Sequence, residues 1–339
     1  MTDPDALFEE GYRLYTEAED AESLAKALEL LGKASASGHP LAQDVLGNMY
    51  EDGDGVSEDV SAALHFYRLS AEQGCPAGMY DLGMLYLDGR GVESDEERAF
   101  SLIQKAAESG DPEHVYALSV LYHEGRGVEA DPGKALSLLR KAADLGSPDA
   151  KAGLGAMMLS GEGMEKDEAA AFALLKEAAE DGECSAMCNL GLMYEGGILV
   201  PEDSATAMAY YRQAADLGYP PAFYHMAMMA FDGKAGIPDL DPMGLLEAAG
   251  GGGCAEAVRQ LGERFYYGDG VEADMEMACQ YFRAGADMDD AACMYDLGVM
   301  IVRGEARASY DGEEYDLILA SADAGYGPAK ELADKTAEG

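Results

Sequence analysis

The sequence lacks a long apolar segment. None of its apolar runs approaches the roughly 18 residues that identify a membrane-spanning helix, so we expect no membrane span. The start of the chain, MTDPDALFEEGYRLY, also lacks the basic and apolar regions of a secretory signal. We therefore expect a protein of the cytoplasm.

Basic residues are scarce as well. The 339 residues include 23 lysines and arginines against 65 aspartates and glutamates, which gives a formal net charge of −42. A field of this sign repels phosphate groups, so we expect neither nucleic acid nor an anionic membrane as a partner. The charge has two interpretations that the sequence leaves open: it attracts a basic partner, or it only keeps the chain soluble.

Motifs of catalysis and metal binding are missing. The sequence contains no GxSxG, no HExxH and no CxxC pair. Cys184 and Cys188 are four residues apart and could share a helix face, but two further metal ligands are not evident. We expect no cofactor, no metal and no catalytic residue. All six cysteines are predicted to be free thiols that act as small apolar side chains.

What the chain has instead is a repeat of 36 residues. One position of it runs through Gly47, Gly83, Ser119, Gly155, Gly191, Ala227, Gly262 and Gly298, with one step of 35 residues. A fixed period in this range indicates a solenoid rather than several separate domains. We predict about nine repeats in a single domain, 1–339. It comprises a capping repeat at 5–38, central repeats at 39–288, a C-terminal repeat at 289–325 and a terminal helix stub at 326–339.

Each repeat is predicted to contain two helices and a glycine turn. A proline two residues after a glycine, as in Gly38 and Pro40, is typical of one helix ending and the next beginning. An aspartate such as Asp131 caps the second helix. The Gly-x-Gly between the helices, as at Gly89 and Gly91, has neither the preceding strand of a phosphate loop nor the acidic pattern of a calcium loop. We interpret it as a helix-to-helix turn, and the predicted fold is all-α.

The repeat has a recognisable form. The segments AGMYDLGMLYLDGRGVESDEERAFSLIQKAAESG and CSAMCNLGLMYEGGILVPEDSATAMAYYRQAADLG share its alanines, glycines, tyrosine and aspartate. This pattern resembles the Sel-one-like repeat, a relative of the tetratricopeptide repeat, over almost the whole chain. The resemblance implies a right-handed αα superhelical solenoid of helix-turn-helix repeats that serves as a protein-binding scaffold or adaptor, not as an enzyme.

Some bacterial relatives carry one disulfide per repeat and have been linked to β-lactam binding. A hydrolase or penicillin-binding activity is therefore the alternative function that the resemblance suggests. Here Ala107, Ala143 and Ala179 stand at one cysteine position of that pair, which argues against the disulfide-bearing group. A self-assembling structural spacer is a third class of function.

The first helices carry a second apolar stripe beside their packing face. In related solenoids the first helices line the concave wall, so we expect this stripe to bind a protein or peptide, in particular one with a basic segment. The predicted groove residues are Tyr80, Leu87, Tyr116, His123, Tyr224, Met228, Phe231, Tyr266 and Tyr295. The stripe is polar at Asp44, Asn48 and Glu51, where we expect it to be solvated. Alternatively, much of the stripe packs against the first helix of the neighbouring repeat.

One glycine run departs from the repeat pattern. The four glycines Gly250 to Gly253 form either a hinge or a wide turn, and the slip of only one residue in the period favours the turn.

Overall fold

The computed structural model describes residues 3–234, 236 and 240–337. Within these residues every regular element is an α-helix and no strand occurs, which confirms the predicted all-α class. The contacts of the chain fall into two compact units, Met1–Asp167 and Glu168–Gly339. That residues 1–339 form a single repeat domain stays a prediction.

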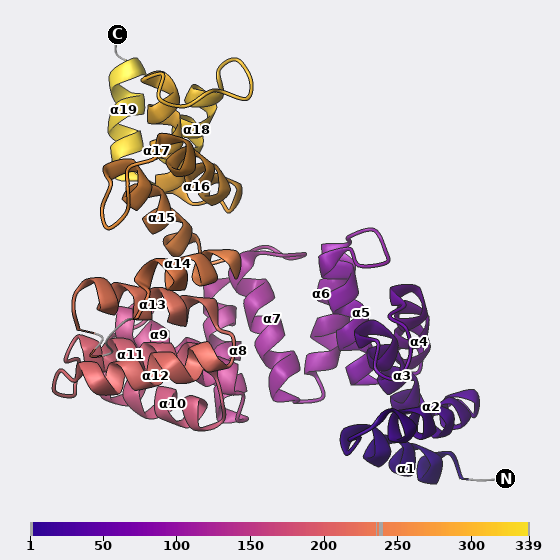
Figure 1. Cartoon of the computed structure of the whole chain (residues 1–339). Helices are drawn as coiled ribbons and strands as arrows, with labels where there is room; N and C mark the ends of the chain where they lie inside the picture. The colour runs from indigo at the N-terminus through magenta and orange to yellow at the C-terminus, as the bar shows by residue number, and fades with distance from the viewer. Residues whose placement is uncertain (1–2, 235, 237–239, 338–339) are drawn as a thin grey trace. The chain divides into compact units, whose positions relative to one another are not determined.

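From residue 3 onward, the first unit contains four helix pairs and one further helix, coloured from indigo to pink in Figure 1. Its helices are α1 (Pro4–Thr16), α2 (Ala21–Ala36), α3 (Pro40–Asp52), α4 (Val60–Glu72), α5 (Pro76–Asp88), α6 (Glu96–Ala107), α7 (Pro112–Glu124), α8 (Pro132–Asp144) and α9 (Pro148–Ser160). The most extensive packing joins α1 to α2, α3 to α4, α5 to α6 and α7 to α8. These pairs are the predicted repeats.

The second unit begins with α10, the second helix of the repeat that α9 opens. Its helices are α10 (Glu168–Glu180), α11 (Cys184–Glu195), α12 (Ser204–Asp216), α13 (Pro220–Phe231), α14 (Pro242–Gly251), α15 (Ala255–Tyr267), α16 (Met275–Asp287), α17 (Ala291–Val302), α18 (Glu313–Asp323) and α19 (Gly327–Ala337). Again each odd-numbered helix from α11 to α17 packs most closely against the helix that follows it. The final helix, α19, is the predicted terminal helix.

Local signals in the sequence explain where the helices begin and end. The side chain of Asp131 accepts a hydrogen bond of 3.0 Å from the backbone N–H of Lys134 at the start of α8. Aspartates cap six other second helices in the same way: Asp20, Asp59, Asp95, Asp203, Asp241 and Asp274. Each such cap contributes about 1 kcal/mol. Gly89 ends α5 with a φ of 66°, and Gly91 follows with a φ of 69°, so the Gly-x-Gly forms the predicted turn.

The repeated glycine inside the first helix makes room for a large side chain of the second helix. A Cβ atom placed on Gly47 would lie 2.4 Å from the ring of Tyr67, and one on Gly191 would lie 2.4 Å from the ring of Tyr211. Both tyrosines are fully buried. The small residue is therefore required because an aromatic ring of the partner helix rests directly on the backbone.

The four consecutive glycines do not form the wide turn that the sequence favoured. Gly250 and Gly251 belong to the last turn of α14, Gly252 is its C-cap, and only Gly253 has a positive φ, of 94°. The helix therefore includes the first two glycines of the run and ends at Gly251.

Candidate partner-binding surface

The predicted groove residues lie on the first helices of their repeats. In the first unit they belong to α5 and α7, and in the second unit to α13, α15 and α17. First helices of successive repeats also contact each other directly, α3 with α5 and α13 with α15. Part of the stripe is therefore used between repeats, as the alternative interpretation expected.

Tyr80 shows this double use. Its ring stacks on the buried His114 of the next repeat, with 4.7 Å between ring centroids, and its hydroxyl donates a hydrogen bond of 3.3 Å to Glu113. Leu87 is more deeply buried than Tyr80, because only 7% of its surface is exposed. Leu87 is a core residue that offers a partner almost no contact, contrary to its predicted place in the groove.

Tyr116 and His123 on α7 are more accessible to a partner, as expected for groove residues. Tyr116 is half-buried and His123 is exposed. Seven residues separate them, so they lie two turns apart on the same face of the helix. The first unit therefore presents an aromatic and an imidazole side chain along α7.

On α13 the predicted residues are half-buried. The Tyr224 ring meets the ring of His225 edge to face at 5.2 Å, and Met228 is half-buried one turn further on. Phe231 is covered by a cation of its own chain, because the guanidinium carbon of Arg264 lies 3.2 Å from the Phe231 ring centroid. Arg264 is in turn held by Asp269 at 2.8 Å. One face of Phe231 is thus already occupied.

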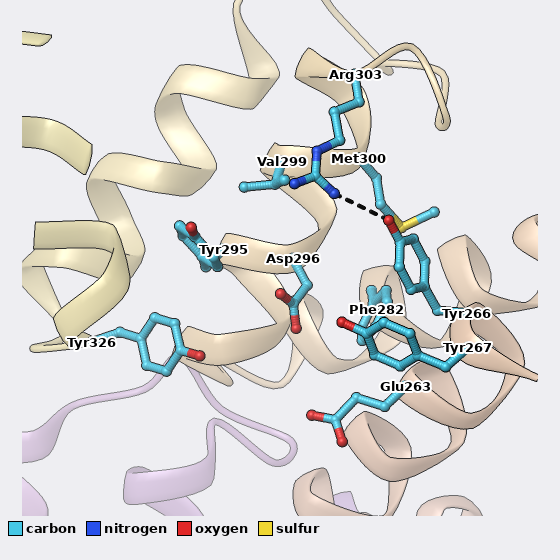
Figure 2. Close-up of a pocket in the computed structure, with 10 residues that line it drawn as sticks. All are labelled: Glu263, Tyr266, Tyr267, Phe282, Tyr295, Asp296, Val299, Met300, Arg303 and Tyr326. Atoms are coloured by element: carbon cyan, nitrogen blue, oxygen red, sulfur yellow. Dashed lines mark hydrogen bonds between the residues drawn. The ribbon is translucent and has the colours of Figure 1, made fainter. Parts of the chain in front are cut away.

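Tyr266 and Tyr295 line a pocket in the second unit, shown in Figure 2. The cavity has a volume of about 300 Å³. Its walls are built from α15, α16, α17 and the segment just before α19: Glu263, Tyr266, Tyr267, Phe282, Tyr295, Asp296, Val299, Met300, Arg303 and Tyr326. The predicted groove thus contains a hollow where two of its tyrosines meet two further tyrosines and two carboxylates.

Helical spacing explains how these side chains come together. Glu263 and Tyr266 lie one turn apart on α15, and Asp296 and Val299 lie one turn apart on α17. The two helices are consecutive first helices of their repeats, with α16 packed against both. Phe282 of α16 is 2% exposed and forms the floor.

The pocket is acidic, and its central carboxylate is Asp296. In Figure 2 this carboxylate points into the space between Tyr267 and Tyr326. Burial, followed by the negative charges of Glu263 and Asp290, raises the pKa of Asp296 to about 6. Burial and the nearby Asp296 likewise raise the pKa of the Tyr326 hydroxyl, so this tyrosine is neutral at physiological pH.

A basic side chain lies at the rim of the pocket but is engaged elsewhere. Arg303 donates a hydrogen bond of 3.1 Å to the hydroxyl of Tyr266, and that hydroxyl donates one of 3.0 Å to Glu305. This chain of hydrogen bonds orients Tyr266 and engages the guanidinium of Arg303. The pocket therefore keeps its negative charge.

Sequence reasoning missed the carboxylates of the pocket, because acidic residues are too common in this chain to stand out. No sequence motif marked Glu263, Asp296 or Tyr326 as residues of a pocket. Only Glu263 had a hint in the sequence, because it lies one helical turn before Tyr266 on α15.

The polar part of the stripe is not solvated as expected. Asp44 is only 5% exposed, and its Oδ1 atom has no hydrogen-bond partner within the described residues. Its carboxyl group forms a hydrogen bond with that of Asp81 on α5, and burial raises the pKa of both groups. Glu51 is half-buried, 2.7 Å from the hydroxyl of Tyr67. The first unit thus holds buried acidic groups between α3 and α5.

The described part of the chain offers little for other kinds of site. Residues 3–234, 236 and 240–337 contain no cluster of three or more metal-ligating side chains. The six cysteines are free thiols in the structure, and four of them are buried. No helix among the described residues is long and apolar enough to cross a membrane.

The repeat pattern identifies the family. The model of the Sel1 repeat matches seven segments, 5–39, 40–75, 76–111, 115–147, 148–183, 184–219 and 255–290, which together cover well over half of the chain. The chain belongs to the Sel1 repeat family. Sel1 repeats are typically protein–protein interaction scaffolds, and no catalytic family is indicated. Two helix pairs lie outside the matches, α13 with α14 and α17 with α18.

Solved structures of Sel1 repeat proteins support the same assignment. A Sel1 repeat protein from Oxalobacter formigenes is 28% identical, with a TM-score of 0.62, and the likeness covers 72% of this chain and 96% of that one. A protective antigen with an SLR fold from uropathogenic Escherichia coli is 26% identical, with a TM-score of 0.56, over 96% of this chain and 70% of that one. No curated protein gives a significant match. The fold is therefore the αα solenoid predicted from the sequence.

Proposed function

We propose that this Sel1 repeat protein is a non-enzymatic scaffold that binds a protein or peptide through a basic segment with apolar anchors. The observation that carries the proposal is the pocket of the second unit, where four tyrosines surround two carboxylates. The pocket joins the matched repeat at 255–290 to α17, which lies outside the family matches. It is thus formed where the chain departs from the shared repeat pattern.

Tyrosines and acidic groups contribute to binding in different ways. A tyrosine offers a large contact area with little loss of rotamer freedom, and aromatic anchors dominate the energetics of many interfaces. The net charge of −42 acts over longer distances and accelerates the approach of a positively charged partner. A basic segment would use both features, whereas an acidic segment would be repelled before contact.

The test uses synthetic peptides that each carry one tryptophan. The chain itself contains no tryptophan, so the tryptophan emission reports on the peptide alone. Peptides with lysine or arginine beside leucine or phenylalanine are compared with peptides in which glutamate or glutamine replaces the basic residues. We expect only the basic peptides to bind, with association rates that fall as salt is added, because exposed charges are screened beyond roughly 8–10 Å at physiological ionic strength.

Variants of the groove separate contact from steering. Tyr116→Ala and Tyr224→Ala remove contact area and should speed dissociation of the basic peptide, with a loss on the order of 2 kcal/mol at a hot spot. Salt should act mainly on association. Equal binding of the glutamate peptides, or rates that do not respond to salt, would contradict the proposal.

A further inference from the structure

The pocket between α15 and α17 has the size of a site for one side chain. Ligand pockets in proteins usually start at about 300 Å³, and this cavity has a volume of about 300 Å³. It is therefore too small for a helix or a folded loop. A single long side chain fits the available space better than any larger element of a partner.

The charges around Asp296 favour a cation in this space. No hydrogen bond or ion pair of Asp296 is found within the described residues. On α15 it faces Glu263, which accepts a hydrogen bond of 2.8 Å from Gln260. Arg259 of the same helix is paired with Asp290 at 3.3 Å. Asp296 is thus half-buried among negative groups, while the neighbouring arginine is engaged by another carboxylate.

Arg303, near the end of α17, is the remaining cation close to Asp296. It is bonded to the hydroxyl of Tyr266 and makes no ion pair with Asp296 in the structure. Among the described residues, no cation of the protein is therefore paired with Asp296. A half-buried carboxylate gains most from an external positive charge that also forms hydrogen bonds with it.

The aromatic walls favour the same ligand. The rings of Tyr295 and Tyr326 lie 5.5 Å apart with an angle of 54° between them, and those of Tyr266 and Tyr267 lie 4.9 Å apart at 83°. The two rings of each pair are not parallel, so the four rings face different directions. An ammonium or guanidinium group over a tyrosine face is stabilised by the negative face of the ring.

We propose that this pocket binds one organic cation, the ammonium group of a lysine or the guanidinium group of an arginine supplied by the partner, with Asp296 as its counter-ion and Tyr295 and Tyr326 as its walls. The inference rests on the proposed function, because it names the group of the basic segment that is recognised. A free diamine offers the same chemistry and is distinguished from the side chain below.

Single residues with blocked ends are the first probes. The acetylated amides of arginine and lysine are compared with those of citrulline and norleucine, which have similar shape and no charge, by following the tyrosine resonances of the full chain in NMR titrations. We expect shifts at the pocket tyrosines with the charged probes only. If citrulline amide produces the same shifts at the same concentrations as arginine amide, charge is not recognised and the inference is overturned.

Variants then assign the site. Asp296→Asn should weaken binding of the basic peptide by about tenfold, as removal of one member of a desolvated charge pair does. Glu272→Gln is the matched control, because Glu272 is exposed on a loop of the same unit and its loss changes the net charge equally. An equal loss in both variants would show long-range steering only and would overturn the pocket. Tyr295→Leu, which keeps apolar volume without an aromatic face, should also weaken binding.

The dependence on pH gives a readout that a purely structural role would not produce. Because the pKa of Asp296 is raised to about 6, binding of the arginine probe should weaken as the pH falls through 6 and the carboxylate takes up a proton. The Asp296→Asn variant should lack this step. A wild-type chain whose affinity is constant between pH 5 and pH 7.5 would contradict the inference.

The outcomes distinguish the pocket from the scaffold. If basic peptides bind but Asp296→Asn behaves like Glu272→Gln, the pocket inference fails and the proposed function stands. If free putrescine and the single-residue cations bind while basic peptides bind no better than glutamine peptides, the pocket holds a free amine. In that case the cation site stands and the proposed function fails. Circular dichroism melting of every variant checks that the fold is retained.

Discussion

The buried carboxyl pair Asp44 and Asp81 should make the first unit less stable as the pH rises. The two groups lie on α3 and α5, share a hydrogen bond and are shielded from water. Burial, the charge of Asp44 and the nearby Glu51 and Glu113 all raise the pKa of Asp81. We therefore expect the pair to keep one proton at neutral pH, which an unfolded chain would release. The substitution that tests this is Asp81→Asn. The amide has the shape of the carboxyl group and donates a hydrogen bond, but it is neutral at every pH and does not have to take up a proton.

The magnitude follows from the proton that must be held. One pKa unit corresponds to about 1.4 kcal/mol, and neutral pH lies about three units above an ordinary aspartate pKa of about 3.9. Keeping one carboxyl protonated at pH 7 therefore costs on the order of 4 kcal/mol, less whatever the site recovers by relaxation. Between the ordinary and the raised pKa the folded chain binds more protons than the unfolded chain. The pair therefore does not destabilise the folded chain below about pH 4. The folded chain loses stability as the pH rises above that value, because the unfolded chain releases the proton that the pair must keep.

The assay is urea denaturation at pH 4.5 and pH 8, followed by circular dichroism. The wild-type chain should lose stability between the two conditions, partly because its net charge grows. Asp81→Asn should lose less, and its gain over wild type at pH 8 should be about 2–4 kcal/mol, shrinking toward pH 4.5. Glu129→Gln, an exposed loop residue of the same unit, removes the same charge and corrects for general repulsion. If Asp81→Asn and Glu129→Gln show the same dependence on pH, the pair does not hold a proton and the reasoning is wrong.

Three further experiments test the packing of the helices and the state of the cysteines. Tyr122→Ala should lower the free energy of unfolding by about 3 kcal/mol or more, because Tyr122 is only 7% exposed. Tyr116 is half-buried, so Tyr116→Ala should lower it clearly less in the same thermal melts. Equal losses of stability in the two variants would show that both stripes belong to the core. Gly47→Ala should destabilise the folded chain by about 1–3 kcal/mol, because the added Cβ would meet the Tyr67 ring. Gly32 on α2 has open space around it, so Gly32→Ala should stabilise the folded chain by up to about 1 kcal/mol. Thiol titration should find six groups in the denatured, unreduced chain; fewer would indicate disulfides.

The repeats were predictable because the same local signals recur along the sequence. The aspartate caps, the turn glycines and the small residue under a partner side chain recur every 36 residues, so a single interpretation is tested many times within one chain. The groove was less predictable, because side chains at the same repeat position have different neighbours. Tyr80 and Tyr116 occupy equivalent positions, yet Tyr80 is stacked on His114. Leu87 is buried although His123, 36 residues later, is exposed.

The second helix decides what the first helix can present. Where the side chain under the repeated glycine is a tyrosine, its hydroxyl reaches a glutamate near the end of the first helix: Tyr67 lies 2.7 Å from Glu51, and Tyr211 donates a hydrogen bond of 2.8 Å to Glu195. These two pairs are 144 residues apart, which is four repeats. Where the buried residue is the phenylalanine of α16, the corresponding first-helix position is Tyr266. A buried hydroxyl needs an acceptor, so a tyrosine in the core favours a carboxylate at the adjacent surface. The alternation of acidic and aromatic positions along the proposed binding surface is thus tied to the core beneath it, and a substitution such as Tyr211→Phe should release Glu195 as well as alter packing.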